Sequence, residues 1–261
     1  MKHKIGCVLA VCFILGFSPV TMNAQETEKQ YQMFWVADEL VKPSMKAEYY
    51  EAGKLWIDLL KKHEFPYSFD TYWTGDNHVY WVVPIDNYAD IDKLMGAADQ
   101  LRVKSPGDFQ TMEDAFKGTY VSSRLCVYAL DYKMSMISED KEGESEEENF
   151  VRFDIYYFEP GTEAELNKIW DELGELMKDK EDIQRWYFYR GMMGTDNPVL
   201  LGAASAKDRM TYFEENAKMW KALGEEAGKI RQKMMKFVRK QEQKNAWYQK
   251  ELSYTPAKKE E

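Results

Sequence analysis

The sequence predicts an α+β protein in which two similar halves form a single barrel, and three observations support this prediction. Short segments in the first half recur in the second half in the same order. Each half alternates strand-like segments with amphipathic helical segments. Of the 261 residues, 44% are hydrophobic and 15% are aromatic, so the chain can build an apolar core and is not wholly disordered.

The repeat consists of four pairs of similar segments. They are Lys42–Tyr49 with Glu159–Leu166, Gly75–Val79 with Thr195–Val199, Gln110–Met112 with Gln232–Met234, and Leu130–Tyr132 with Leu252–Tyr254. The spacing between partners grows slowly along the chain, as small insertions in one half would produce. We therefore expect an internal duplication rather than chance similarity.

The first half contains four strand-like segments and two helical regions. Pro43-Ser44 is typical of a helix start, and apolar residues follow it at three- and four-residue steps. The sequence Gly75-Asp76-Asn77 is typical of a hairpin turn. We expect strands at Met33–Ala37, Tyr67–Trp73, Val79–Val83 and Leu125–Tyr132, and helices at Ser44–Phe65 and, interrupted at Ser105-Pro106-Gly107, at about Tyr88–Phe116.

The second half repeats this order of elements. We expect strands at Phe150–Phe158, Trp186–Arg190, Val199–Ala203 and Trp247–Tyr254, and helices at Thr162–Leu176 and about Lys207–Lys240, the latter bent near Gly224 and Gly228. The order βαββαβ is that of the ferredoxin-like unit, whose helices cover one face of its sheet. The other face must also be covered, so we predict tandem ferredoxin-like repeats forming one pseudo-two-fold α/β barrel.

The first 24 residues have the pattern of a secretory signal peptide. Lys2 and Lys4 precede an apolar run at Ile5–Phe17, and Ala24 is a small residue suited to the position before the cleavage site. The run is too short to span the ~30 Å hydrocarbon core of a bilayer, so we expect cleavage rather than anchoring. No later segment could span a membrane. The expected location is the periplasm or the exterior.

After the signal peptide, we expect the first repeat over residues 25–137, an acidic linker over 138–149 and the second repeat over 150–261. The linker is a block of like charges that holds nothing apolar to bury, so it is predicted to be solvated. The alternative, a calcium site, lacks the ligand spacing of a calcium-binding loop.

The net charge of −10 argues against a nucleic-acid partner. Cys126 is the one cysteine left after signal cleavage, which excludes an intrachain disulfide. It lies in an apolar stretch, so a buried, inert thiol is expected.

Each half contains a strand end followed by proline and a helix start, at Val41–Met45 and Phe158–Thr162. These openings, and the order of elements, resemble those of the dimeric α/β-barrel superfamily. The openings look like those of its NIPSNAP-type and antibiotic-biosynthesis-monooxygenase-type members. The resemblance covers nearly all of the mature chain. It implies a cofactor-independent monooxygenase, a haem-binding or haem-degrading protein, an isomerase or a protein without known activity, because fold alone does not set function.

The candidate site consists of side chains that face inward between the two sheets. In Phe150–Phe158, one alternating set is apolar and the other contains Arg152, Asp154 and Tyr156. We assign the polar set to the interior because the helix-facing set should be the more apolar. The repeat adds residues from the first half, and the second strands add others, including Asp70 and Trp186. The predicted ligand-binding residues are Trp35, Glu39, Tyr72, Arg152, Asp154, Tyr156 and Arg190.

Such a cavity would suit a small polar or aromatic ligand. A desolvated carboxylate in it could act as a base with a raised pKa. The alternative is that Arg152 forms a structural ion pair with Asp154 or Glu39, or that these groups are solvated at a strand end.

The predicted function is therefore binding of a small organic ligand between the sheets, with monooxygenase-like activity implied by the resemblance. One alternative is a non-catalytic envelope or interaction protein whose barrel is filled by its own side chains. Another is a haem-binding protein with His63 or His78 as the axial ligand, although both histidines are expected at the surface. No cofactor and no metal site are predicted. Because both halves lie in one chain, we expect a monomer or a weak homo-oligomer.

Overall fold

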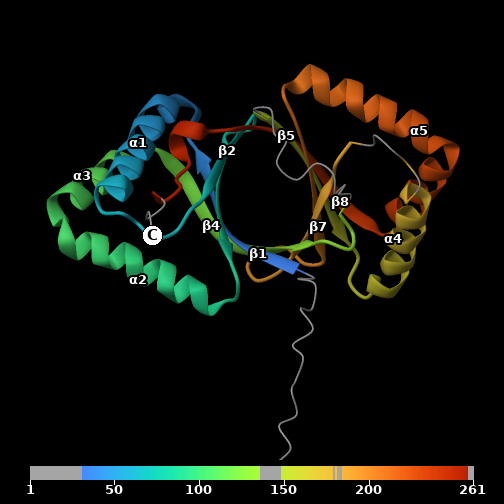
Figure 1. Cartoon of the computed structure of the whole chain (residues 1–261), viewed down its shortest axis with the longest axis horizontal. Coiled ribbons are helices and arrows are strands. Elements are labelled where there is room, and N and C mark those ends of the chain that lie inside the picture. The colour runs from blue at the N-terminus through green and yellow to red at the C-terminus, as the bar shows by residue number, and fades with distance from the viewer. Residues whose placement is uncertain (1–30, 136–147, 179, 181–183, 258–261) are drawn as a thin grey trace, which may run out of the picture.

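A computed structural model of the chain describes residues 31–135, 148–178, 180 and 184–257. In this part of the chain, eight strands form a closed barrel in the order β1-β3-β2-β8-β5-β7-β6-β4. Every neighbouring pair of strands is antiparallel. Figure 1 shows the barrel as a ring with helices on two opposite sides. The predicted fold class is confirmed.

Each half contributes four strands. Their bounds are β1 Tyr31–Val41, β2 Asp70–Thr74, β3 His78–Ile85, β4 Tyr120–Asp131, β5 Phe150–Phe158, β6 Tyr187–Gly191, β7 Val199–Ala206 and β8 Val238–Tyr248. Two pairings join the halves and close the barrel: β2 with β8, and β4 with β6. The two sheets thus cover each other, as the sequence predicted.

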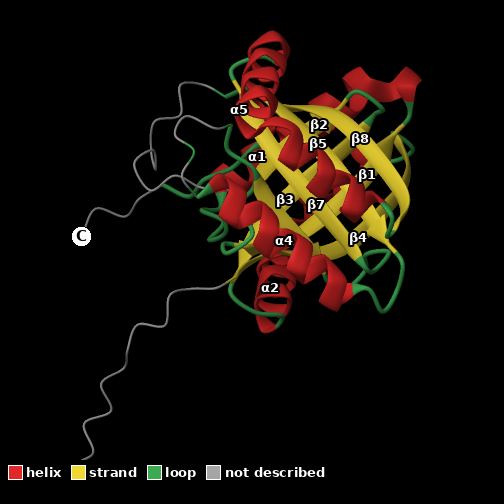
Figure 2. Cartoon of the chain, turned by 90° about the vertical axis from the view of Figure 1, so that its right-hand side faces the viewer, coloured by secondary structure: helices red, strands yellow, loops and turns green. Residues whose placement is uncertain are grey.

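The helices lie outside the barrel and cover each sheet from its outer face (Figure 2). Their bounds are α1 Lys46–Lys62, α2 Ala89–Lys104, α3 Pro106–Phe116, α4 Glu163–Met177 and α5 Arg209–Met235, with short 3-10 turns at η1 Pro43–Met45 and η3 Lys250–Leu252. None of the described helices has the length and apolar character needed to cross a membrane. The predicted signal peptide and most of the predicted acidic linker lie outside the described residues.

The last two elements differ from the prediction. The helix α5 ends at Met235 and β8 already begins at Val238, whereas the sequence favoured a helix to Lys240 and a strand only from Trp247. Pairing of β8 with both β5 and β2 overrides its weak local strand preference. The predicted bend in α5 is confirmed at Gly224, where φ is 69°.

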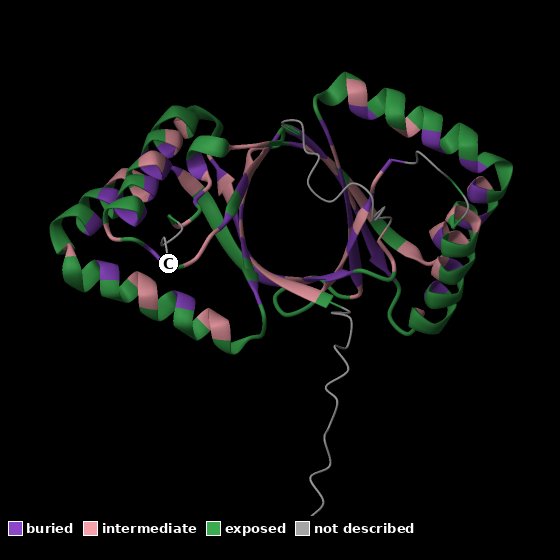
Figure 3. Cartoon of the chain, in the orientation of Figure 1, coloured by how far each residue is buried: buried purple, intermediate pink, exposed green. Residues whose placement is uncertain are grey.

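The apolar cores lie between each sheet and its helices. The first core contains Tyr49, Leu60 and Val79, all with no exposed surface, and the second is built around Phe150 and α5. The C-terminal segment returns to the first core, where Leu252 is fully buried. Figure 3 shows the buried positions along the barrel and the inner faces of the helices.

Alternation along the strands decides which side chains enter the barrel. In β1, Val36 and Asp38 point inward, while Trp35 and Glu39 face the helices. In β5 the inward set is Val151, Phe153, Ile155 and Tyr157.

Candidate ligand cavity

The interior of the barrel holds a cavity of about 850 Å³. Side chains from all eight strands line it. An eight-stranded barrel is often just wide enough for its own side chains to fill it. Here small residues such as Ala203, Ser122 and Ser205 share the wall with the larger ones and leave the space open.

Aromatic rings make up much of the cavity wall. They are Phe34, Tyr72, Tyr80, Tyr128, Phe153, Tyr157, Tyr187 and Tyr189. Tyr72 and Tyr80 each meet Phe153 edge to face, with ring centroids 6.0 and 5.8 Å apart, respectively. Burial raises the pKa of Tyr72, Tyr80 and Tyr189, so their hydroxyls stay protonated at neutral pH. The wall therefore offers neutral rings whose hydroxyls can donate and accept hydrogen bonds.

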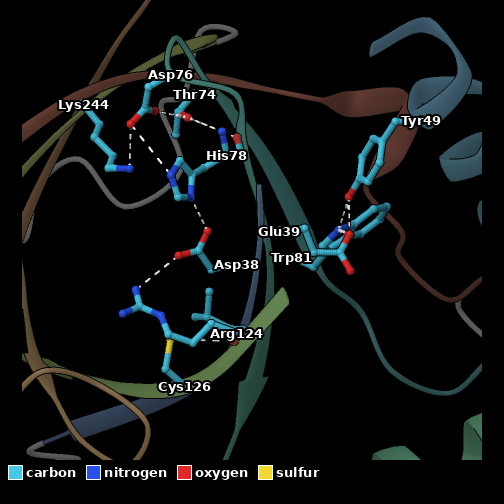
Figure 4. Close-up of polar contacts among 11 residues, drawn as sticks. Asp38, Glu39, Tyr49, Thr74, Asp76, His78, Trp81, Arg124, Cys126 and Lys244 are labelled. Atoms are coloured by element: carbon cyan, nitrogen blue, oxygen red, sulfur yellow. Dashed lines mark hydrogen bonds and ion pairs between the residues drawn. The ribbon is translucent and has the colours of Figure 1, made fainter. Parts of the chain in front are cut away.

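A chain of charged and polar side chains lies at one end of the cavity (Figure 4). The Arg124 guanidinium lies 3.2 Å from one Asp38 oxygen, and the other Asp38 oxygen lies 2.6 Å from His78 Nδ1. His78 Nε2 is 3.9 Å from Asp76, whose carboxylate accepts a hydrogen bond from Lys244 at 2.8 Å. We refer to Arg124, Asp38, His78, Asp76 and Lys244 as the polar chain.

The turn between β2 and β3 places Asp76 and His78. The Asn77 backbone has φ of 71°, which Asn tolerates better than most residues. The Thr74 hydroxyl donates to Asp76 over 2.5 Å and accepts from the His78 backbone N–H over 2.9 Å. Burial tends to raise the pKa of Asp76, but hydrogen bonds from Lys244 and Thr74 outweigh it and lower that pKa. Asp76 is thus held as a carboxylate.

The Asp38–His78 contact gives the polar chain a group that can accept a proton. When Nδ1 donates to Asp38, Nε2 of a neutral imidazole is left as an acceptor. A histidine oriented by a carboxylate in this way can take a proton from a bound molecule.

The other end of the cavity is different, because its carboxylate has no cationic partner. Asp70 opens β2, at the end remote from the Asp76 turn, and lines the cavity with Tyr72 and Tyr189. Its carboxylate accepts a hydrogen bond from the Tyr248 hydroxyl. Burial raises the pKa of Asp70, and this hydrogen bond only partly opposes the effect. Among the described residues, no Lys, Arg or His forms an ion pair with it.

Only one of the seven predicted site residues, Tyr72, lines this cavity. Arg152, Asp154 and Tyr156 were expected inside the barrel, but they face the helices and line a second cavity of about 650 Å³ beneath α4 and α5. Arg152 forms an ion pair with Asp154 at 2.8 Å and donates to Asn245 at 2.9 Å. The structural ion pair considered from the sequence is therefore present.

The remaining predicted residues also lie outside the barrel. Trp35 and Glu39 line a third cavity, of about 630 Å³, on the helix side of the first sheet. Glu39 accepts hydrogen bonds from the Tyr49 hydroxyl at 2.5 Å and the Trp81 indole at 3.3 Å (Figure 4). Arg190 pairs with Asp131 at 2.7 Å, on the helix-facing side of β6. Whether these residues bind a ligand stays a prediction, but they do not meet in one site.

The inward set of β5 was predicted wrongly because the barrel interior is itself apolar and aromatic. The rule that the helix-facing set is more apolar fails when both faces are buried. A shift of one residue then exchanges the faces. The prediction missed Asp38, Asp76, Arg124 and Lys244 as cavity residues, and it named His78 only in the haem alternative. One feature of the sequence indicates the position of His78: it directly follows the Asp76-Asn77 turn and so begins the next strand.

The positions of His78 and Cys126 test the predictions of a surface histidine and a buried thiol. His78 was expected at the surface, but its side chain is 24% exposed and lies in the barrel wall. Cys126 is buried, as predicted, and burial raises the pKa of its thiol to about 11, which makes it unreactive. The described residues contain no group of three His, Cys, Asp or Glu side chains arranged to hold a metal ion.

The described strands form one closed α+β barrel from two ferredoxin-like halves within a single chain. A putative monooxygenase of Fusobacterium nucleatum subsp. nucleatum ATCC 25586 is similar, with 14% identity, a TM-score of 0.51 and coverage of 84% of this chain and 93% of that chain. An anthrone oxidase-like protein has 10% identity and a TM-score of 0.51, with coverage of 85% and 92%. At these identities the similarity shows a shared fold and does not extend to activity.

No protein-family profile matches the sequence. No curated protein matches it either.

Proposed function

We propose that this protein binds a small aromatic organic molecule inside its barrel. The observation that supports this most directly is the cavity of about 850 Å³, lined by tyrosine and phenylalanine rings. Ligand sites of ~300–1,000 Å³ with apolar walls and a few polar groups are typical of proteins that bind small molecules. The alternative of a barrel filled by its own side chains does not agree with a cavity of this size.

The wall offers two means of orienting such a molecule. Neutral rings such as Tyr80 and Phe153 give edge and face contacts to an aromatic ligand. The polar chain at one end offers His78 Nε2 as a hydrogen-bond acceptor, held in place by Asp38. A ligand hydroxyl could donate to this nitrogen.

Monooxygenase-like activity is the finer part of the proposal. It is supported by the family resemblance of the sequence and by the proton-accepting Asp38–His78 pair. In such a reaction without a cofactor, the substrate is the only reductant: a CH₂ carbon beside the aromatic ring loses both hydrogens and becomes C=O with one oxygen atom of O₂, and the other oxygen atom leaves with the two hydrogens as water. Oxygen consumption after addition of a bound aromatic ligand, abolished in His78→Ala, would support it. Binding without oxygen consumption would restrict the protein to a binding role.

The binding proposal is tested by reducing the cavity. Leu201 lies on the inner face of β7, and Leu201→Trp adds an indole to the interior. We expect this variant to weaken binding of 4-ethylphenol, measured by calorimetry, at least tenfold. Val103→Trp is the matched control, because Val103 is 81% exposed on α2. Equal affinity in Leu201→Trp and the control, with both folded, would refute the barrel as the binding site.

We do not extend the proposal to haem. His63 caps the C-terminus of α1, outside the barrel. Asp38 contacts only Nδ1 of His78, so a Soret band on adding haem, lost in His78→Ala, is the result that would favour haem over an aromatic ligand. The NIPSNAP-type resemblance rests on the sequence openings alone and stays a prediction.

Export is a separate proposal that rests on the N-terminal sequence pattern. The intact mass of the protein recovered from outside the cytoplasm of its own cell should correspond to a chain beginning at Gln25. Recovery of the full-length mass from the cytoplasm would refute it.

Because the barrel closes within one chain, we also propose a monomer or weak homo-oligomer, which light scattering after size-exclusion chromatography would test.

A further inference from the structure

We infer that the barrel selects an aromatic ligand that carries a positive charge, such as an aryl alkyl amine. The inference rests on the proposed function and specifies its ligand class. It follows from how the acidic and basic side chains of the cavity wall pair with one another, and from the one carboxylate for which no basic partner is described.

The cavity wall carries more acids than bases. The acidic residues are Asp38, Asp70, Asp76, Asp196 and Glu242, and the basic ones are Arg124, Lys240 and Lys244. Each base already has a carboxylate partner from the same wall: Arg124 with Asp38, Lys240 with Glu242, and Lys244 with Asp76. No basic side chain of the wall is therefore left to bind an anionic ligand.

Of the two acids that remain, Asp70 is the one without a cationic partner in the part of the chain that the structure describes. Asp196 forms an ion pair with Arg239 at 2.7 Å. Asp70 forms no ion pair among the described residues, and its carboxylate accepts a hydrogen bond from the Tyr248 hydroxyl. Asp70 lines the cavity and is itself exposed, so a ligand can reach its carboxylate. An ammonium group of a ligand could supply the missing partner.

The surroundings of Asp70 also favour a cation. Tyr72 and Tyr189 lie beside it, and Phe34 meets Tyr189 edge to face with ring centroids 5.7 Å apart. The face of a neutral aromatic ring attracts a cation through its quadrupole. A second carboxylate, Glu148, hydrogen-bonds Ser205 on the cavity wall and adds further negative charge.

The polar chain and the Asp70 end therefore have different roles. In the polar chain, the charges of Arg124 and Lys244 offset those of Asp38 and Asp76 (Figure 4). At the Asp70 end, no described basic side chain pairs with the carboxylate. A ligand with an ammonium group would thus lie with that group toward Asp70 and its ring between the tyrosines.

Three phenols of similar size test this inference: tyramine as the cation, 4-ethylphenol as the neutral compound and 4-hydroxyphenylacetate as the anion. We expect tyramine to bind at least tenfold more tightly than 4-ethylphenol, and the anion to bind most weakly. Asp70→Asn should reduce tyramine affinity at least tenfold and change 4-ethylphenol affinity less than twofold. Asp70→Glu keeps the charge and should retain the preference for tyramine.

Asp58→Asn is the matched control, because Asp58 is an exposed carboxylate on α1. It should leave all three affinities unchanged. Thermal denaturation confirms that each variant is folded. If 4-ethylphenol binds in the barrel but tyramine binds no more tightly, or if Asp70→Asn weakens both equally, the charge inference is wrong and the proposed function stands. If no phenol binds in a manner sensitive to Leu201→Trp, both are wrong.

Discussion

Neighbouring acids on one strand have different chemistry because alternation sends them to opposite faces of the sheet. Asp38 enters the barrel and pairs with Arg124 and His78, whereas Glu39 faces the helices and meets Tyr49 and Trp81. Glu39 has no cationic partner among the described residues. Burial raises its pKa above the ordinary value, despite the hydrogen bonds that oppose it.

The raised pKa of Glu39 predicts how stability depends on pH. The folded protein holds this proton more tightly than the unfolded chain does, so its contribution is complete below the unfolded pKa and is lost as the pH rises through the folded pKa. Glu39→Gln keeps an acceptor for Tyr49 and removes the titration. Each tenfold difference in proton affinity between the folded and unfolded chain corresponds to about 1.4 kcal/mol. We expect urea unfolding at pH 4 and 8 to show a smaller loss of stability in the variant, and parallel curves would contradict this.

At this scale the sequence could identify the types of site residue but not the face on which they lie. The adjacent pairs Trp35/Val36 and Asp38/Glu39 are similar in polarity, so alternation alone cannot orient β1. Tyr72 was placed correctly, and Asp70 was named as a further candidate. The contact of His78 with Asp38 joins residues 40 positions apart and needs the register of β1 with β3.

At the scale of elements, the loop between β6 and β7 illustrates a position that only glycine fits. Gly194 has φ of 78°, and a Cβ there would lie 2.3 Å from the Leu125 carbonyl oxygen. Gly118 has the same φ but no atom within 4 Å of its Cβ position. Both substitutions to Ala incur the ~1–2 kcal/mol cost of the left-handed region. We expect Gly194→Ala to lower the free energy of unfolding more than Gly118→Ala, because it alone adds a clash with β4.

Urea unfolding of the two glycine variants measures this difference. Equal losses of stability would mean that the loop moves away from β4 without cost. The comparison cancels the backbone contribution that both positions share.

Most elements could be predicted from the sequence because their patterns were local. The bounds of β5 agree with the prediction, and the interruption at Ser105-Pro106-Gly107 separates α2 from α3. The strand β8 could not be predicted in the same way. Its side chains are polar on both faces, since Lys240, Glu242 and Lys244 point into the barrel and form ion pairs there. A strand of this composition resembles a solvated helix until its partners are known.

At the scale of the whole molecule, the C-terminal segment couples the two halves. It follows β8, crosses to the first half and buries Leu252 completely beside α1 and β2. Thr71 donates to the Leu252 carbonyl at 2.8 Å, and the Tyr254 hydroxyl donates to the Phe65 carbonyl at 3.0 Å. The core of the first half is therefore incomplete without residues from the end of the second.

This coupling predicts that the barrel unfolds as one unit. Leu252→Ala should lower the free energy of unfolding by about 2–5 kcal/mol, the usual cost of removing a buried leucine side chain. Leu55→Ala, at a position 42% exposed on α1, should cost about 0.5 kcal/mol or less. Because β2–β8 and β4–β6 join the sheets, circular dichroism and tryptophan fluorescence should report one transition at a single, lower midpoint. Two transitions, with only one shifted by Leu252→Ala, would instead show that each half unfolds independently.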